Sequence, residues 1–199
     1  MKDVEELLNQ LNLNSNISLH DIPEIDLYMD QVIQLFESKF GGLKRSKDDK
    51  VLTKTMINNY AKGKLFFPIK NKKYSKQHLI LISLIYQMKG ALSINDIKTV
   101  LDPLNEKMME GNFQIEELYE NFLQISEQNV SEFEKDIKNQ AAAVSGYMGE
   151  AFAGDEDYEM LNQIVLIASL VHMSSLYRRM AERIVDDMIE ERKPLKNKD

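Results

Sequence analysis

The sequence predicts a mostly helical (all-α) protein with one small β hairpin, or wing, near its middle and a long helical hairpin at its C-terminal end. Two observations indicate this class. Apolar residues recur at spacings of three and four along most of the chain, which is the period of an amphipathic helix. The 199 residues include only eight Gly and four Pro, so sharp turns should be few.

Composition limits the chemistry and the location that are open to the chain. There is no Cys, which excludes disulfides, thiolate nucleophiles and Cys zinc sites. The acidic N-terminus has no apolar core of signal-peptide length. The dense apolar run at 164–171 is much too short to span a bilayer. We therefore expect a cytoplasmic protein that does not bind a membrane.

Two helices are expected at the N-terminal end. A short amphipathic helix covers residues 2–13. A second helix can be capped by Asp21 and carry Pro23 in its first turn. Its apolar stripe runs from Ile25 to Phe40, before two glycines that should end it. The charged segment 43–51 has no apolar period and should be an exposed loop.

A short polar helix and a basic hairpin are expected next. Thr53 is a suitable N-cap for a helix at 54–62, and Leu52 and Ile57 have the spacing of a hydrophobic staple. Gly63 should end this helix. Residues 65–69 favour a strand, and a Lys-Asn-Lys turn would lead back to Tyr74. Proline at 68 restricts such a hairpin to a sheet edge, so residues 66–74 should form an exposed wing.

Four more helices complete the prediction. An apolar helix capped by Ser75 should be buried on most sides. Ser93 and Asp96 have capping-box spacing at the start of the next helix, which Pro103 should weaken. A long helix from about 114, a glycine-containing turn at 146–154 and a final helix from Asp155 to about 191 should form an antiparallel hairpin. The all-round apolar run 164–171 implies burial against a further surface, either the first domain or a second subunit.

These elements divide the chain into three parts. We expect an N-terminal helix at 1–20, a central domain at 21–104 and a C-terminal helical hairpin at 105–199 that mediates dimerisation or senses a ligand.

The charge is distributed unevenly. The net charge is −7, but residues 44–78 contain eleven Lys or Arg and two Asp, a net +9 that leaves −16 for the remainder. One basic patch on an acidic body orients a protein toward a polyanion. The alternative interpretation is that the lysines only add solubility.

Several short motifs follow one another through the central segment. They read Ile57-Asn58-Asn59-Tyr60, Lys64-Leu65, Pro68 and Tyr74 in the wing, and Ser93-Ile94-Asn95-Asp96-Ile97. In this order they resemble the winged helix-turn-helix of the MerR family, in which a short recognition helix and a basic wing lie on duplex DNA. Three features depart from that pattern. Asn58 replaces the phosphate-contacting Arg of the family, and the wing is shorter. The first helix of the family would have to be Ile25 to Phe40, which is longer than usual and separated from the recognition helix by a loop.

A wider stretch, residues 22–101, contains LTKTMINNY at 52–60 and KKYSKQHL at 72–79. It is similar to a bacterial domain-of-unknown-function family numbered 1836. That family has no established biochemical activity, so the similarity implies the fold class and little else.

Duplex DNA binding needs cations along a convex face and side chains that reach base edges. Asn can bond the edge of adenine, and Lys or Thr can reach phosphate. The alternative for Asn58 and Asn59 is that they are ordinary polar surface residues. Tyr60 and Tyr74 are expected in the core with their hydroxyls near phosphate. The predicted contact residues on the recognition helix and the wing are Lys54, Thr55, Asn58, Asn59, Tyr60, Lys62, Lys64, Lys70, Asn71, Lys72, Lys73 and Tyr74.

Catalysis and cofactor binding have little support. The three histidines, His20, His78 and His172, are isolated in the sequence, and there is no Gly-rich phosphate loop. The acidic cluster 154–157 could suggest a metal site, but a negative first turn of a helix explains it as well. We therefore expect no enzyme activity, no cofactor and no metal.

The sequence favours a sequence-specific DNA-binding protein, a transcription regulator that acts as a homodimer and could respond to a small-molecule effector. The alternative is a protein-interaction module on a MerR-like fold that has lost DNA binding, which Asn58 and the acidic body favour. A third reading, a small-molecule sensor without DNA binding, would require a pocket between the C-terminal helices.

Overall fold

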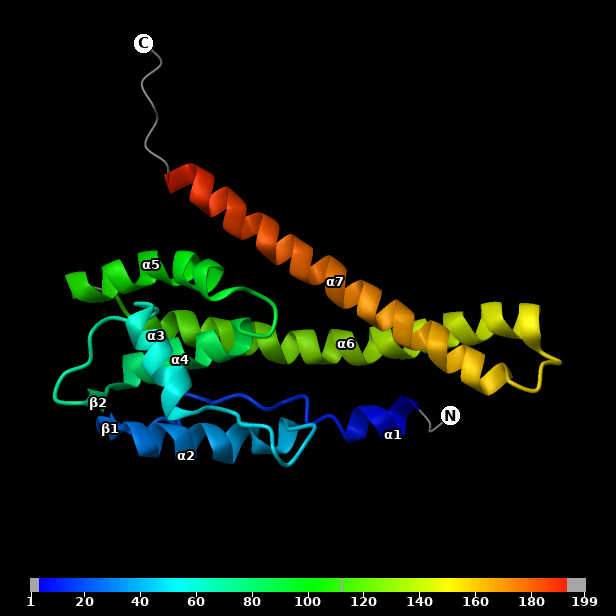
Figure 1. Ribbon diagram of the computed structural model, residues 1–199, viewed down its shortest axis with the longest axis horizontal. Coiled ribbons are helices and arrows are strands. Elements are labelled where there is room, and N and C mark those ends of the chain that lie inside the picture. Colours follow the sequence, from blue (N-terminus) through cyan, green and yellow to red (C-terminus); the bar gives the residue numbers. More distant parts are fainter. Residues whose placement is uncertain (1–3, 112, 193–199) are drawn as a thin grey trace, which may run out of the picture. The chain divides into compact units, whose positions relative to one another are not determined.

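The computed structural model describes residues 4–111 and 113–192, and it is mostly helical with a two-stranded antiparallel sheet (Figure 1). This confirms the predicted class. The chain forms two compact units. Within the described residues, one unit contains 4–14 together with 124–177, and the other contains 15–123 together with 178–192.

The unit built on residues 15–123 contains most of the short elements. In chain order they are β1 (Leu27–Tyr28), α2 (Met29–Phe40), the 3-10 helix η1 (Gly41–Leu43), α3 (Lys54–Lys62), β2 (Lys73–Tyr74), α4 (Lys76–Met88), α5 (Ile94–Glu110) and the start of α6 (Ile115–Phe152).

Helix α4 lies at the centre of this unit. Its four consecutive residues from Leu79 to Ile82 have no exposed surface, and neither does Ile85. Side chains of α2, α3, α5 and α6 complete one continuous apolar core around it. The prediction that this helix is buried on most sides is therefore confirmed. At the far end of the unit, the Tyr119 hydroxyl of α6 donates a buried hydrogen bond of 2.7 Å to the carbonyl of Ile17.

The start of the second predicted helix was wrong. Helix α2 begins at Met29 rather than near Ile25, which is 69% exposed. The expected cap, Asp21, accepts hydrogen bonds from the backbone and hydroxyl of Ser18 and is therefore engaged in its own turn. The Gln31 side chain instead accepts from the Tyr28 backbone N–H at 2.9 Å, which sets the helix start one residue later.

The strand pairing also differs from the predicted hairpin. Strand β2 pairs antiparallel with β1, with Leu27 opposite Tyr74 and Tyr28 opposite Lys73. Residues 65–69 form no strand. The next residue, Lys70, is joined to β2 by a single antiparallel bridge to Lys73. A sequence-local hairpin was expected, whereas the observed partner lies more than forty residues earlier in the chain.

Two helices continue past residues that usually interrupt them. Helix α5 runs through Pro103 to Glu110, and α6 runs through Gly146 and Gly149 to Phe152. The predicted end of the long helix at these glycines was therefore wrong. A glycine in a helix costs only about 1 kcal/mol, and this part of α6 recovers more by packing Val144 and its apolar neighbours.

The other unit contains a helical hairpin. Residues 141–148 of α6 pack against Leu166 and its apolar neighbours near the start of α7 (Tyr158–Arg192). The Tyr158 hydroxyl donates to the carbonyl of Ser145, and the Asn162 side chain donates to the Ser145 hydroxyl, both at 3.3 Å. The final helix begins three residues later than Asp155, because the carbonyl of Asp157 accepts the first helical hydrogen bond from Leu161.

The N-terminal helix belongs to the same unit and is shorter than predicted. Helix α1 covers Val4–Asn9, whereas the prediction extended to Leu13, and its predicted start at Lys2 lies outside the described residues. Val4 packs against the hairpin core, and Glu5 forms an ion pair of 2.7 Å with Lys138 of α6.

Helix α7 contains a longer uncharged segment than the run 164–171 on which the membrane argument was based. Among the described residues it is the one helix with an 18-residue window long and apolar enough to cross a bilayer by length and composition, with a mean hydropathy of 1.4. Only 11% of that window is buried. Much of its apolar surface is therefore exposed.

A buried histidine connects the wing segment to α4. The His78 side chain is 3% exposed, and its Nδ1 accepts from the Ser75 backbone N–H at 3.1 Å, which caps the helix. Its Nε2 donates to the carbonyl of Phe67 at 3.1 Å. Burial lowers the pKa of His78 below its ordinary value, and this effect outweighs the opposing influence of the Phe67 carbonyl and of Asp26. The expectation that His78 is an ordinary helix residue thus becomes more specific: it is a neutral N-terminal cap.

We predict that the stability of the protein falls as the pH is lowered through the ordinary histidine range. Below about pH 6.5 the unfolded chain binds a proton at His78, whereas the folded chain binds it less readily because burial lowers the pKa of this residue. The free energy of unfolding therefore decreases as the pH falls, by at most about 1.4 kcal/mol per pH unit for this group. Urea unfolding between pH 5.5 and 7.5 measures the slope.

The substitution His78→Gln should lower stability at pH 7.5 and flatten this slope, whereas His172→Gln, at an exposed position, is the matched control. An unchanged slope in His78→Gln would show that other groups cause the pH dependence.

Candidate nucleic-acid interface

The short helix α3 is fixed at both of its ends by local signals. At its start the Thr53 hydroxyl accepts from the Met56 N–H at 3.1 Å, and the predicted staple residues Leu52 and Ile57 are both buried. The predicted helix and its cap are thus confirmed. Because Ile57 and Tyr60 face the core, the remaining side chains must lie on the opposite face.

The outer face of α3 is entirely polar. At 100° per residue, its five side chains fall within an arc of about 140°. All five are exposed, and two are amides. This arc contains Lys54, Thr55, Asn58, Asn59 and Lys62.

The end of α3 is closed by a lysine where a glycine is usual. The Leu65 N–H donates to the Tyr60 carbonyl and the Lys64 N–H to the Ala61 carbonyl, which is the hydrogen-bond pattern of a Schellman motif. The left-handed residue is Lys64, with φ 56°, rather than Gly63. Gly63 leaves room for a neighbour: a Cβ there would lie 2.7 Å from the Leu65 side chain, which is fully buried and would have to shift.

A tight turn, which we call the basic turn (residues 70–73), presents the second group of lysines. The Lys73 N–H donates to the Lys70 carbonyl at 2.9 Å, and the two central residues, Asn71 and Lys72, have φ 52° and 60°. Positive φ at both central positions is typical of a type I′ turn. The sequence correctly predicted a turn here.

Lysine is an unfavourable residue at two positions of this surface, one at the end of α3 and one in the basic turn. A left-handed backbone costs a residue other than glycine about 1 kcal/mol, which glycine would avoid. Lys64 and Lys72 both adopt it, and both side chains are exposed. Strain at an exposed polar side chain is commonly retained for a function of that side chain.

The two predicted tyrosines are core residues. Tyr60 is 4% exposed and Tyr74 is 1% exposed, and burial raises the pKa of both hydroxyls. The Tyr74 ring meets the rings of Phe66 and His78. Both side chains belong to the apolar core on which α3 and the basic turn lie.

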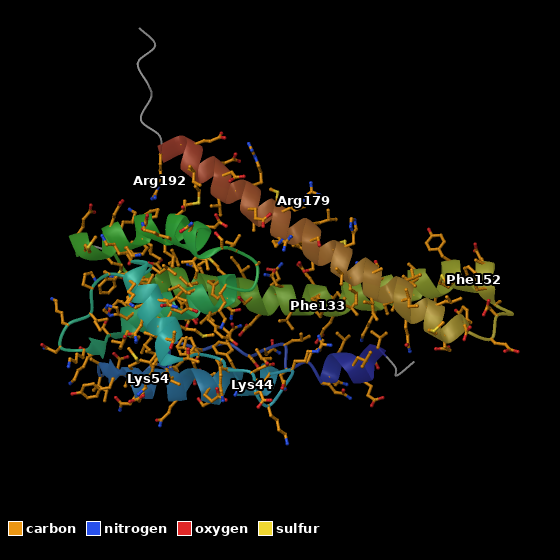
Figure 2. All side chains as sticks on the ribbon, viewed as in Figure 1. Lys44, Lys54, Phe133, Phe152, Arg179 and Arg192 are labelled. Atoms are coloured by element: carbon orange, nitrogen blue, oxygen red, sulfur yellow. The ribbon has the colours of Figure 1, made fainter. Side chains whose placement is uncertain are left out.

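Acidic side chains lie beside this surface, and sequence reasoning missed them. Lys54, labelled in Figure 2, forms an ion pair of 2.7 Å with Asp30 at the start of α2. Lys76 similarly pairs with Glu24 at 2.6 Å. Residues 51–75 themselves contain six lysines and no acid, so the outer face of α3 and the basic turn remain positive. These acids lie more than twenty residues before their lysine partners in the chain, so no local signal in the sequence indicates that they are neighbours.

The connection from α2 to α3 spans residues 41–53 and is longer than the three- or four-residue turn of a simple helix-turn-helix. It is anchored rather than loose. Val51 is 3% exposed, and its carbonyl accepts a 2.9 Å hydrogen bond from Lys89, whose charge lies 4.1 Å from the centre of the Tyr86 ring. Burial lowers the pKa of Lys89.

The comparisons with known proteins concern the same part of the chain. No curated protein and no solved structure gives a significant match. A family model described as a domain of unknown function (DUF1836) matches residues 17–122, just over half of the chain. The matched residues include those that form the core around α4, from Ile17 to Tyr119. The chain therefore belongs to the DUF1836 family.

Proposed function

We propose that this protein is a sequence-specific DNA-binding protein and acts as a transcription regulator. The observation that carries the proposal is the outer face of α3, where exposed Lys, Thr and Asn side chains fill one arc of a rigid helix. Asn58 lies within that arc, between Lys54 and Lys62, and would read a base edge in the major groove, since Asn pairs with adenine through two edge atoms. Lys62 and Thr55 lie farther around the same arc and would contact phosphates.

The basic turn would contact the backbone of the same duplex. Lys70 and Lys72 extend from a turn held by backbone hydrogen bonds, so the backbone beneath each charge need not be ordered on binding. Their charges would neutralise phosphates and release counterions. In this arrangement α3 supplies specificity and the basic turn supplies affinity.

We propose further that the central unit is a MerR-like winged helix-turn-helix, with α3 as recognition helix. The capping box that opens α5 supports this, because Ser93 and Asp96 exchange hydrogen bonds of 3.1 and 3.2 Å at the position where the MerR pattern has its own Ser-x-x-Glu. The basic turn at the expected wing position supports it too. Such units act in pairs on one duplex, in the cytoplasm of a bacterium, so the proposal includes a homodimer.

A salt titration tests DNA binding. We predict that the protein binds mixed-sequence duplex DNA at low salt, and that the logarithm of the association constant falls with the logarithm of salt concentration with a slope of roughly −4 to −8, from several phosphate contacts per dimer. Fluorescence anisotropy of a labelled duplex measures it.

The triple substitution Lys70→Glu, Lys72→Glu and Lys73→Glu should abolish most of this affinity for every sequence. Its matched control changes Lys98, Lys107 and Lys135, on α5 and α6, to Glu and should retain most of it, although the net charge is the same. No binding by the wild type at low salt would refute the proposal, and equal loss in both variants would show a nonspecific charge effect.

A second prediction distinguishes the effect of the left-handed backbone at Lys72 on stability from the effect of its side chain on DNA binding. The substitution Lys72→Gly should raise the free energy of unfolding by up to about 1 kcal/mol, because glycine adopts the left-handed backbone without strain. The same change should weaken DNA binding and reduce the salt slope by about one per copy of the site.

The control Lys72→Gln removes the charge and keeps the strain, so it should lose affinity without gaining stability. If Lys72→Gly is more stable and binds DNA as the wild type does, the lysine has no part in the interface.

The alternative function is a protein-interaction module. The ion pairs of Lys54 with Asp30 and of Lys76 with Glu24 make the edge of the surface mixed in charge, and mixed charge suits a protein partner better than a polyanion. Two results together would select this function. The wild-type chain should show no salt-sensitive affinity for DNA, and it should form a defined complex with one other protein that the triple Lys→Glu variant does not form.

A further inference from the structure

Helix α7 has apolar side chains on two faces, and only one of them is packed. The packed face includes Leu166, 8% exposed, and Asn162, 4% exposed, against α6. The other face carries a stripe with the spacing 4, 3 and 4, which keeps its members on one side of the helix. We call it the outer stripe: Met160, Ile164, Ile167 and Val171, which are 49%, 53%, 61% and 61% exposed.

Such a stripe is more than scattered surface hydrophobicity. Single exposed apolar residues need no explanation, but a contiguous row at heptad spacing marks a surface that another helix covers. The outer stripe consists of long aliphatic side chains, the kind that fill the seam between paired helices. It therefore calls for an occupant with a matching apolar row.

The two ends of the outer stripe carry opposite charges. Asp157 lies three residues before Met160, and Arg178 lies seven residues, two helical turns, after Val171. Both are therefore on the same face as the stripe, and both are exposed. Arg178 is held along the helix by Glu182 at 3.5 Å, which leaves the rest of its guanidinium available to a second carboxylate. The face thus runs from negative through apolar to positive.

This pattern is self-complementary. The midpoint between Asp157 and Arg178 coincides with the midpoint between Ile164 and Val171, and it falls between Ile167 and Ala168. We propose that a second copy of this chain covers the outer stripe, with the two α7 helices antiparallel around a two-fold axis at this midpoint. Each Asp157 then faces Arg178 of the partner subunit, and each Ile164 faces Val171 of the partner subunit.

Further residues fit the same register. Glu156, in the turn just before α7, and Arg179, labelled on α7 in Figure 2, are equidistant from the midpoint in residue number and opposite in charge. Met160 is paired with the small side chain of Ser175, so a large residue meets a small one. A two-fold axis requires such matching of one patch with itself.

Other occupants fit less well. A parallel second copy would place Asp157 against Asp157 and Arg178 against Arg178, and like charges repel. A bilayer would have to accommodate the polar side chains of Gln163 and His172 within the uncharged segment of α7. Helix α6, which forms the other half of the hairpin in the same chain, carries five charged residues between 132 and 138, and a bilayer disfavours these too. A second antiparallel copy satisfies both the apolar stripe and its charged ends.

Single cysteines test the geometry directly, because the natural chain has none. Ile167→Cys lies next to the proposed axis, so two copies should be joined by a short bismaleimide linker. In Met160→Cys the two thiols would be about 22 Å apart along the helix axes, fifteen residues at 1.5 Å each, and should not be joined. Linked dimer from both variants would show a parallel pair, and linked dimer from neither would overturn the proposal.

Charge exchange tests the ends. Asp157→Arg and Arg178→Asp should each weaken dimerisation, by about tenfold or more for two broken pairs, and the double variant should recover it. In a parallel dimer neither single variant would weaken the dimer. Analytical ultracentrifugation of the full chain measures the dissociation constant, and helical content by circular dichroism checks that each variant is folded.

The apolar contribution has its own variant. Ile164→Glu with Val171→Glu should weaken the dimer by at least about 100-fold, since four charges would be buried per dimer without a partner. Both positions are exposed in the single chain, so the monomer should fold. If instead the wild type stays monomeric in solution and floats with lipid vesicles, the stripe covers a membrane and the proposal fails. The interface lies on α7 and does not depend on DNA binding, so a dimer without DNA affinity would refute the proposed function alone.

Discussion

The burial of α4 on most of its sides is the constraint on which the matched unit depends. A helix that is apolar on all sides cannot rest on a single neighbour, so α2, α3, α5 and the start of α6 each cover part of it. This requirement places α3 with its apolar side inward and its polar arc outward. The candidate interface is therefore a consequence of the core: once Ile57 and Tyr60 are buried, Asn58 and Lys62 must be exposed.

The sequence predicted those features whose signals are local. The Thr53 cap, the Ser93 capping box and the apolar run of α4 each lie within a few residues of the structure they specify, and all are observed. Strand β1 is two residues long and pairs with β2 across more than forty residues, so neither periodicity nor turn chemistry could reveal it. The same limit hid the proximity of Asp30 to Lys54 in the candidate site. The cap at Asp21 was misjudged because a carboxylate can also close a local turn, here with Ser18.

Charge and strain combine in the candidate interface. The lysines at 64 and 72 occupy backbone conformations that glycine would adopt at lower cost, and they do so on a surface with no acid between residues 51 and 75. Natural sequences keep a locally unfavourable residue where function requires it. Solubility alone is a poor explanation, because a lysine adds as much solubility at any exposed position without strain. The binding role proposed for these two side chains would account for both observations.

Helix α7 has to be aligned with one helix on each of its two faces: with α6 of the same chain on the packed face, and with α7 of the second copy in the proposed dimer. Different residues specify the two alignments. On the packed face Asn162 reaches Ser145 of α6, and a buried amide in an apolar seam permits only the alignment in which it finds its partner. The outer stripe has no buried polar residue, and aliphatic side chains alone tolerate a shift by one heptad. In the proposed dimer its alignment would come from the ends, because a slip of one heptad would move the carboxylate of Asp157 and the guanidinium of Arg178 in each pair about 10 Å apart. The buried Asn162–Ser145 contact therefore aligns the two helices when the hairpin folds. The charged residues at the ends of the outer stripe would then align two folded hairpins when they pair, so different residues specify the two steps.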